Sequence, residues 1–358
     1  MPYSQFQRLV QLSLGVMFFT TSFVTIAEPQ EKGKYFGARE TEYPAWFKNS
    51  FLDLKEDVSE AKKAGKRVMI FFHQDGCPYC NALVEKNLAQ KDIQEKVRKH
   101  FDVISINMWG DRDITDIDGK EYSEKTFAEK MRVQFTPTII FFDEAGKKVL
   151  RLNGYRSPQR FTHDLDYVAL KKENDISYRD YIKSIAQPEK SSKKLNSQPF
   201  FSDNYTLTRD GKKPLAVFFE QTDCPNCDTL HRKVLPDRDT QKIIQQFDVV
   251  QLNMWSQQEV TTPMGKKTTA REWAKELDIK FAPSIVVFNK HGEEIIRSEA
   301  FFKIFHTQSI FDYVLTEAYK KEPSFQRYLT ARADHIRESG KSVDIWRYAD
   351  EEPGKHKD

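Results

Sequence analysis

Two pairs of cysteines are the side chains in this sequence best suited to do chemistry. Cys77 and Cys80 enclose Pro-Tyr, Cys224 and Cys227 enclose Pro-Asn, and the chain has no other cysteine. A CxxC pair can bind a metal, attach a haem, form a structural disulfide or exchange disulfides with other thiols. Haem attachment needs a histidine directly after the second cysteine, whereas asparagine and aspartate follow these two pairs.

Zinc and a static disulfide are further alternatives for the cysteines. A four-cysteine zinc site would have to close the loop from residue 81 to residue 223, which is 143 residues long. Zinc ribbons use loops of about 15–20 residues. A purely structural disulfide stays possible, but a CxxC at the start of a helix is typically redox-labile. We therefore favour redox activity of at least one pair, and expect no metal and no cofactor.

The two pairs lie in two copies of one sequence pattern. "VMIFFHQDGCPYC" (68–80) matches "LAVFFEQTDCPNC" (215–227), and "FDVISINMW" (101–109) matches "FDVVQLNMW" (247–255). A period this long indicates a duplicated domain rather than a solenoid. The predicted organisation is a signal peptide at 1–27, a first domain at 28–183, a linker at 184–199, a second domain at 200–337 and a charged, frayed tail at 338–358.

The order of predicted elements places each cysteine pair at the start of a helix. In the first copy the apolar run 67–72 predicts a buried strand that ends near the pair. Residues 78–90 have helical spacing, with Pro78 in the first turn, where a helix tolerates proline. A strand, a helix, a β-hairpin and a last helix are predicted at 101–108, 123–133, 137–154 and 160–170. This order predicts an α/β fold with a mixed central sheet in each copy.

These residues resemble the thioredoxin-like family. The shared pattern is a strand ending in a CxxC that opens a helix, followed later by Thr-Pro or Ala-Pro before the hairpin. The sequence is closer to exported proteins of the SoxW type, which have a similar insertion before the proline and a "GY…F…L.YV" ending, here "GYRSPQRFTHDLDYV" (154–168). The resemblance covers roughly 45–170 and 196–315. It implies two tandem thioredoxin-like domains.

Position along the helix assigns different roles to the thiols. A cysteine at a helix N-terminus meets the positive end of the helix dipole and unpaired N–H groups, and both stabilise a thiolate. Cys77 and Cys224 are therefore predicted to be the attacking nucleophiles. Cys80 and Cys227 lie one turn deeper and are predicted to resolve the mixed disulfide.

The resemblance implies further features of the site and its partners. Pro137 and Pro283 would be cis prolines packed against the sulfurs, and the backbone of Thr136 and Ala282 would pair with an incoming peptide. The implied activity is that of a thiol–disulfide oxidoreductase, a reductase of client proteins such as sulfur carriers or cytochrome-maturation proteins. Its implied electron donor is a membrane thiol transporter of the DsbD kind. An oxidase or isomerase, or a binding protein with static disulfides, are the alternatives.

The sequence departs from thioredoxin near the cysteines. Thioredoxin has a buried acid six residues before its first cysteine, where this chain has Phe71 and Phe218. His73 and Glu220 are candidates for handling the proton, and partly exposed strand-end residues are the alternative reading. Acidic side chains surround the second pair, so its thiols should be less acidic and the pair more reducing. Those side chains are Glu220, Asp223 and Asp228.

Several other residue types allow more than one interpretation. Trp109 and Trp255, each in "NMW" at a strand end, are predicted to pack the inserted segment rather than to line a substrate groove. His163, His231 and His291 have no partners at ligand spacing and are expected to be ordinary surface or helix residues.

Charge and the N-terminus indicate partners and location. The 56 basic and 53 acidic residues are mixed along the chain, which predicts no nucleic-acid binding. The apolar stretch 9–27 follows Arg8 and ends with Thr25 and Ala27, small residues that suit cleavage after Ala27. This pattern predicts a signal peptide and a periplasmic protein, where disulfides persist. An uncleaved membrane anchor is the alternative.

Overall fold

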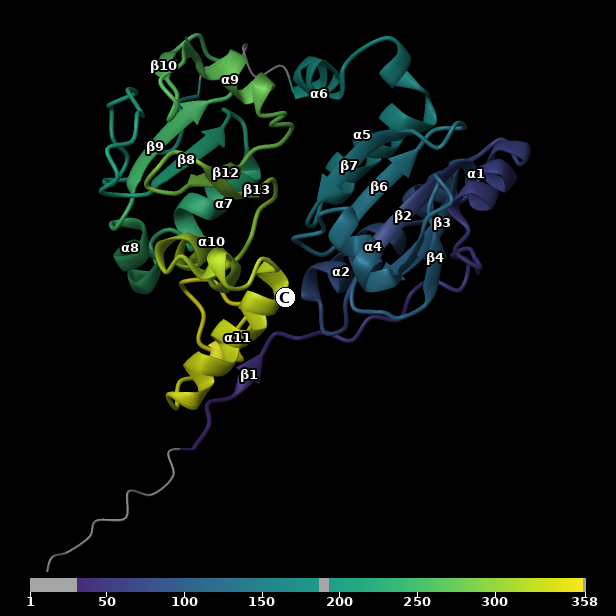
Figure 1. The fold of residues 1–358 in the computed structure, drawn as a ribbon, viewed down its shortest axis with the longest axis horizontal. Helices are drawn as coiled ribbons and strands as arrows, with labels where there is room; N and C mark the ends of the chain where they lie inside the picture. The colour runs from purple at the N-terminus through teal and green to yellow at the C-terminus, as the bar shows by residue number, and fades with distance from the viewer. Residues whose placement is uncertain (1–30, 187–192, 357–358) are drawn as a thin grey trace, which may run out of the picture.

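The computed structural model describes residues 31–186 and 193–356 (Figure 1). The predicted signal peptide at 1–27, with its alternative as an anchor, lies outside the described residues. Part of the predicted linker, 187–192, also lies outside them.

The first domain is built on a four-stranded mixed sheet. Its central strand β2 (Arg67–His73) pairs in parallel with β3 (Phe101–Asn107) and antiparallel with β6 (Thr138–Phe142), which pairs with β7 (Lys148–Asn153). Every residue of β2 is buried. The helices of this domain are α1 (Leu54–Lys63), α2 (Pro78–Ala82) with its π-helical extension η1 (Leu83–Leu88), α3 (Lys91–His100), α4 (Glu124–Lys130) and α5 (Pro158–Ala169).

Side chains of β2 alternate between two apolar layers. Val68, Ile70 and Phe72 pack with α1 and α4, whereas Met69 and Phe71 pack with α2, α3 and α5. Successive side chains of a strand point to opposite faces, so a continuous apolar run is required where helices cover both faces. The predicted buried strand and α/β order are confirmed.

The second domain repeats this architecture. Its sheet has the order β13-β12-β8-β9, formed by β8 (Leu215–Glu220), β9 (Asp248–Asn253), β12 (Ser284–Phe288) and β13 (Glu294–Ser298). The predicted α/β class, with a mixed central sheet in each of two tandem domains, is therefore confirmed. The helices are α7 (Pro225–Lys233), α8 (Arg238–Ile244), α9 (Ala270–Glu276) and α10 (Ile304–Leu315). Each domain also has a short hairpin: β4 (Asp113–Thr115) with β5 (Glu121–Ser123), and β10 (Glu259–Thr261) with β11 (Lys267–Thr269).

One helix at the end of each copy packs against the opposite domain. Tyr178 of α6 (Tyr178–Ala186) meets Phe281 of the second domain, with ring centroids 5.6 Å apart. Phe325 of α11 (Phe325–Glu338) meets Phe135 of the first domain at 5.3 Å. Two short 3-10 turns, η2 (Lys172–Asn174) and η4 (Ala318–Lys320), precede these helices. The two domains thus share one continuous apolar cluster.

The C-terminal tail is ordered against the N-terminal segment. Strand β14 (Val343–Asp344) pairs in parallel with β1 (Tyr35–Phe36), which lies beside α11 in Figure 1. Val343 and Ile345 are buried. The predicted frayed tail is wrong for the described residues 338–356, because a few apolar side chains between the charged ones reach the domain interface.

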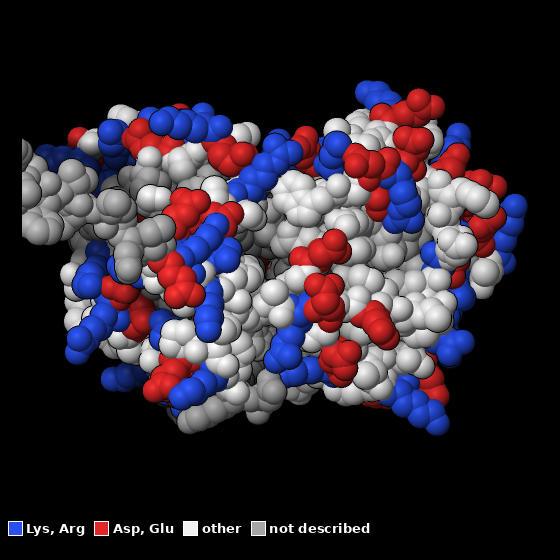
Figure 2. Space-filling model, turned by 90° about the horizontal axis from the view of Figure 1, so that it is seen from below, with Lys and Arg blue, Asp and Glu red and all other residues white. Residues whose placement is uncertain are grey.

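Positive and negative side chains are interspersed over the surface seen in Figure 2. This distribution matches the mixed charge along the sequence.

Candidate active site

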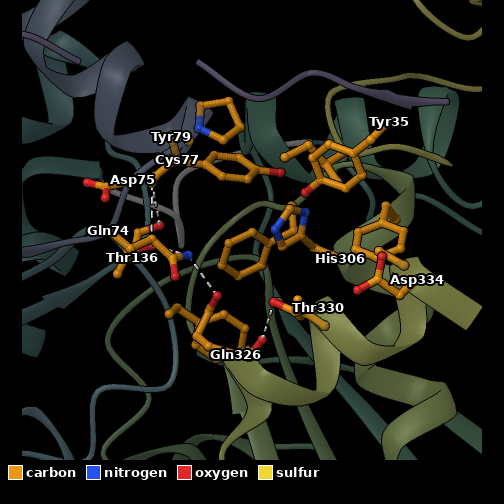
Figure 3. A pocket seen from close by; sticks show the side chains of 18 of the residues that line it. Tyr35, Gln74, Asp75, Cys77, Tyr79, Thr136, His306, Gln326, Thr330 and Asp334 are labelled. Carbon is orange, nitrogen blue, oxygen red and sulfur yellow. Dashed lines mark hydrogen bonds between the residues drawn. The ribbon is translucent and has the colours of Figure 1, made fainter. Parts of the chain in front are cut away.

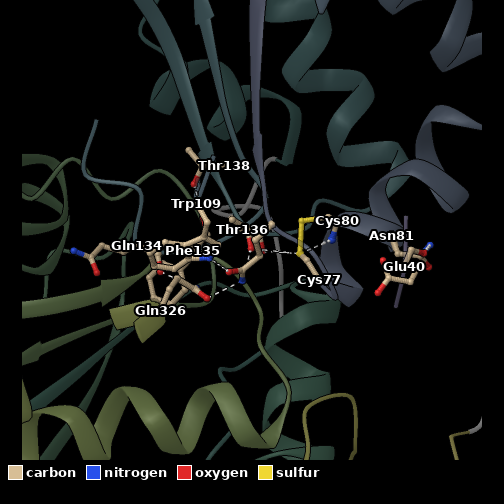
Figure 4. The surroundings of a disulfide bond; sticks show 11 residues. Glu40, Cys77, Cys80, Asn81, Trp109, Gln134, Phe135, Thr136, Thr138 and Gln326 are labelled. Atoms are coloured by element: carbon tan, nitrogen blue, oxygen red, sulfur yellow. Dashed lines mark hydrogen bonds between the residues drawn. A yellow bond between two sulfur atoms is a disulfide. The ribbon is translucent and has the colours of Figure 1, made fainter. Parts of the chain in front are cut away.

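Each CxxC forms a disulfide at the N-terminus of a helix. Cys77 is bonded to Cys80 (Figure 4) and Cys224 to Cys227, with Cα–Cα distances of 5.3 and 5.2 Å, respectively. In each pair the first sulfur caps the helix by accepting the backbone N–H of the second cysteine at 3.1 Å. A proline occupies the first turn of both helices. The predicted placement of the first cysteines at helix starts is confirmed.

The loop before the β-hairpin lies against the first disulfide. The Thr136–Pro137 and Ala282–Pro283 peptide bonds are cis, as the resemblance implied. The Thr136 hydroxyl lies 3.4 Å from Cys77 Sγ, and its carbonyl oxygen lies 3.6 Å from the same sulfur (Figure 4). Ala282 lines a cavity beside the second disulfide and supplies no hydroxyl. Peptide binding by these loops stays a prediction.

A glutamine that the sequence analysis missed connects this loop to its surroundings. Gln74 donates to the Thr136 hydroxyl at 3.1 Å and to the Gln326 side-chain oxygen of α11 at 2.8 Å. Its own side-chain oxygen accepts the Trp109 indole N–H at 2.8 Å. Gln74 therefore fixes the position of the loop beside Cys77 and ties it to the second domain.

The second domain contains the matching pair. The Trp255 indole N–H donates to the Gln221 side-chain oxygen at 2.9 Å, and both residues are buried. Both tryptophans pack on apolar clusters, so the packing prediction is confirmed. The signal for the glutamines was present in the repeat, because Gln74 and Gln221 are identical in "FFHQ" and "FFEQ".

The polar residues at the ends of β2 and β8 are buried. Burial lowers the pKa of His73 to about 4, and its ring lies 4.2 Å from that of Tyr43. Glu220 is fully buried; its carboxylate lies 3.0 Å from His231 Nε2 and accepts from the Gln251 amide at 2.9 Å. The interpretation of His73 and Glu220 as partly exposed is wrong, and His231, expected to be an ordinary surface or helix residue, is a buried residue of α7. A role for these groups in proton transfer stays a prediction.

A cavity of about 300 Å³ adjoins Cys77 between the two domains (Figure 3). Cys77 is only 4% exposed. The second domain and the tail supply much of the wall, so Cys77 lies at the interface between the two domains. Labelled residues of the wall include Tyr35, Thr136, His306, Gln326, Thr330 and Asp334.

Tyr79, between the two cysteines of the first pair, is held by the opposite half of the chain. Its ring packs edge-on against Phe302, His306 and Trp346 at centroid distances of 5.3, 5.2 and 4.8 Å. Its hydroxyl accepts the Lys303 backbone N–H at 2.9 Å. The first CxxC is therefore fastened to the second domain.

The second CxxC is more open. Pro225 and Asn226, between its cysteines, are exposed, and a cavity of about 360 Å³ adjoins Cys224. Residues of the first domain line this cavity, among them His163, which the sequence analysis took for an ordinary surface or helix residue. The two domains thus face each other reciprocally, each contributing to the cavity of the other's cysteine pair.

The family scan agrees with this geometry. The model of the thioredoxin-like domain family matches residues 54–169 and 202–314, together more than half of the chain. The chain belongs to the thioredoxin-like domain family. Both matched segments contain one CxxC, one cis-proline loop and the four strands of one sheet.

Similar proteins include curated thiol:disulfide interchange proteins. The chain is 24% identical over 122 residues to DsbD of Photorhabdus laumondii, covering 34% of this chain and 19% of that protein. DsbD of Colwellia psychrerythraea is 24% identical over 115 residues, covering 32% of this chain and 17% of that protein. The chain therefore spans about a fifth of the length of the curated relatives it matches.

Solved structures show weaker likeness. A thioredoxin-fold protein from Helicobacter pylori is 24% identical, with a TM-score of 0.30, over 38% of this chain and 91% of that one. The first two thioredoxin domains of Eps1p from Saccharomyces cerevisiae are 12% identical, with a TM-score of 0.26, over 68% and 88%. Scores this low add nothing to the family match.

No helix within 31–186 or 193–356 has the length and apolar character to cross a membrane.

Proposed function

We propose that this protein is an exported thiol–disulfide oxidoreductase that reduces the disulfides of client molecules. The observation that supports it most is the capping sulfur of Cys77 and of Cys224, which accepts a backbone N–H at 3.1 Å at a helix N-terminus. The same N–H and the helix dipole stabilise a thiolate once the disulfide is reduced. We also propose that the first domain spans residues 28–183, that the second spans residues 200–337, and that the tail starts at residue 338.

The reaction is a pair of disulfide exchanges. The thiolate of Cys77 or Cys224 attacks one sulfur of the client disulfide, which breaks and releases one client thiolate. The thiolate of Cys80 or Cys227 then attacks the first cysteine and releases the second client thiolate. Two electrons pass from the protein to the client, and the protein is left with the disulfide described above.

A donor dithiol must then supply two electrons that reduce the protein's disulfide again. Two curated relatives carry the name thiol:disulfide interchange protein DsbD. Together with the predicted signal peptide, this name supports a periplasmic location and a membrane thiol transporter of the DsbD kind as the donor. The exposed Asn226 beside Cys224 favours the second domain for first contact with clients, because the first pair lies beneath the opposite domain.

The redox state of each pair in living cells tests the direction of transfer. Cells expressing wild type, the Cys77→Ser/Cys80→Ser variant or the Cys224→Ser/Cys227→Ser variant are acid-quenched and their thiols tagged by mass. We expect at least one pair to be mostly reduced. Pairs that are oxidised yet readily reduced by glutathione would favour an oxidase, and pairs that resist mild reductant would indicate static disulfides.

A further inference from the structure

Equivalent positions of the two domains surround the two cysteine pairs with different chemistry. At an offset of 146, Arg156 matches Phe302 and Arg160 matches His306. Phe302 and His306 line the cavity at Cys77, and Arg156 and Arg160 line the cavity at Cys224. The first cavity is thus aromatic where the second is cationic.

The aromatic positions carry no charge near neutral pH. Phe302 stacks on Phe135 at 4.9 Å, and burial lowers the pKa of His306 to about 4. Beside the cysteine pair of the second domain, Arg156 of the first domain takes the equivalent place, with its guanidinium carbon 3.5 Å from the centre of the Phe281 ring. The same packing position therefore holds a cation only beside Cys224.

Arg156 is held in place but not fully satisfied. It is 6% exposed, and its Nε donates to the buried carboxylate of Asp164 at 3.2 Å. Asp164 also accepts the Tyr178 hydroxyl. Within the described residues, Arg156 Nη2 has no hydrogen-bond partner. A buried N–H group without a partner is uncommon, and a ligand acceptor in the adjoining cavity would satisfy it.

Arg160 adds a second positive charge to the same cavity. Over 31–186 and 193–356, no carboxylate forms an ion pair with Arg160. Burial and the charge of Arg156 lower its pKa, so an anion beside it would offset both effects. The acidic residue at the cavity, Asp223, is paired with Lys193 at 2.6 Å. The residual charge of the cavity wall is therefore positive.

We propose that the cavity beside Cys224 binds an anionic group, a carboxylate carried next to the disulfide of the substrate, through Arg156 and Arg160 of the first domain. The arginine fork matches a planar carboxylate, and the cavity volume of about 360 Å³ suits a small disulfide or one peptide end. This inference rests on the proposed function and adds substrate selection to it. The two domains then differ in specificity, with an anion-selective site at Cys224 only.

A pair of small disulfides tests the inference in the full-length protein. The Cys77→Ser/Cys80→Ser background leaves only the second site, which is reduced beforehand and mixed in a single turnover with dithiodipropionate or neutral hydroxyethyl disulfide. The two compounds are similar in size and differ in charge. The ratio of their second-order rate constants is the readout, because any effect on the thiol pKa of Cys224 changes both rates together.

Arg160→Gln should lower the rate with dithiodipropionate about tenfold relative to the neutral disulfide, as expected for losing one charge-assisted hydrogen bond. Arg160→Lys keeps the charge and should retain most of the preference. Arg98→Gln removes one exposed cation in α3, beside a different cavity, and should leave the ratio unchanged. Arg160 is the primary target because Arg156 also neutralises buried Asp164.

The outcomes separate the two proposals. If the reduced protein reacts with neither disulfide, the proposed function fails and the inference falls with it. If it reduces both and Arg160→Gln leaves their ratio unchanged, only the inference is overturned. Glutathione disulfide and a disulfide-linked acidic peptide are then compared to identify the source of the carboxylate. Arg160→Gln should reduce the small molecule, the peptide or both more slowly. An unchanged rate with both would overturn the inference.

Discussion

Replacing Tyr79 by alanine removes the side chain that fastens the first CxxC to the opposite half of the chain. Tyr79 is 3% exposed, and its aromatic neighbours Phe302, His306 and Trp346 all belong to the second copy or the tail. Truncating a buried aromatic side chain costs about 3–5 kcal/mol. Because those contacts exist only while the domains are docked, opening should become about a hundredfold to a few thousandfold more frequent.

Alkylation of Cys77 measures this opening. The reduced Cys224→Ser/Cys227→Ser protein is treated with a maleimide on a polyethylene glycol chain too large for a cavity of about 300 Å³. The rate is divided by the thiolate fraction from its pH dependence, which removes any effect of the substitution on thiol acidity. Tyr79→Ala should raise the corrected rate by the factor above. Tyr79→Phe, which loses only the bond from the Lys303 N–H, should raise it by about tenfold.

The matched control lies at the same position of the other pair. Asn226 is exposed, so Asn226→Ala should leave alkylation of Cys224 nearly unchanged in the reciprocal Cys77→Ser/Cys80→Ser protein. Equal acceleration in the two domains, or none from Tyr79→Ala, would refute the reasoning that Tyr79 holds the interface closed.

Three further predictions concern polar side chains of the two domains. Gln221→Ala leaves the buried Trp255 indole N–H without its acceptor and should cost about 1–3 kcal/mol in urea unfolding, whereas exposed Gln257→Ala should cost nearly nothing; equal losses would contradict this. The folded pKa of His306, about 4, lies below its unfolded value of about 6.5, so the free energy of unfolding is highest above pH 6.5. It should fall towards pH 4 by up to about 1.4 kcal/mol per pH unit; His306→Phe should flatten this slope, and an unchanged slope would contradict the prediction. Arg179→Ala removes bonds of 2.5 and 2.6 Å from α6 to carbonyls of the second domain and should speed hydrogen exchange of 178–186 at least tenfold; unchanged exchange would exclude this anchoring role.

Local pattern was enough to predict each domain separately. The apolar run of β2 and the proline after Cys77 indicate a buried strand and a helix start, since both depend on residues near in sequence. The repeat then indicated that the second domain has the same fold. The cis peptide bonds at Pro137 and Pro283 came from the resemblance, because spacing does not distinguish cis from trans.

Interdomain packing could not be predicted in this way. Nothing near Tyr79 in the sequence indicates that Trp346 packs on its ring, because 267 positions separate the two, from residue 79 to residue 346. The burial of His231 against Glu220 depends on which face of α7 meets β8. The charge argument for a more reducing second pair used only residues of that copy and omitted Arg160, which the first domain brings to the cavity.

The central claim is that the first cysteine of each pair attacks a disulfide and the second releases it. Trapping of the mixed disulfide tests this most directly. Cys80→Ser and Cys227→Ser, made in chains whose other pair is also replaced by serine, are reduced and mixed with a disulfide-bonded protein such as insulin. We predict a covalent adduct through Cys77 or Cys224 that dithiothreitol removes, and none from the matching Cys77→Ser and Cys224→Ser variants. Adducts that form through Cys80 or Cys227 instead, or no adduct from any variant, would contradict the account.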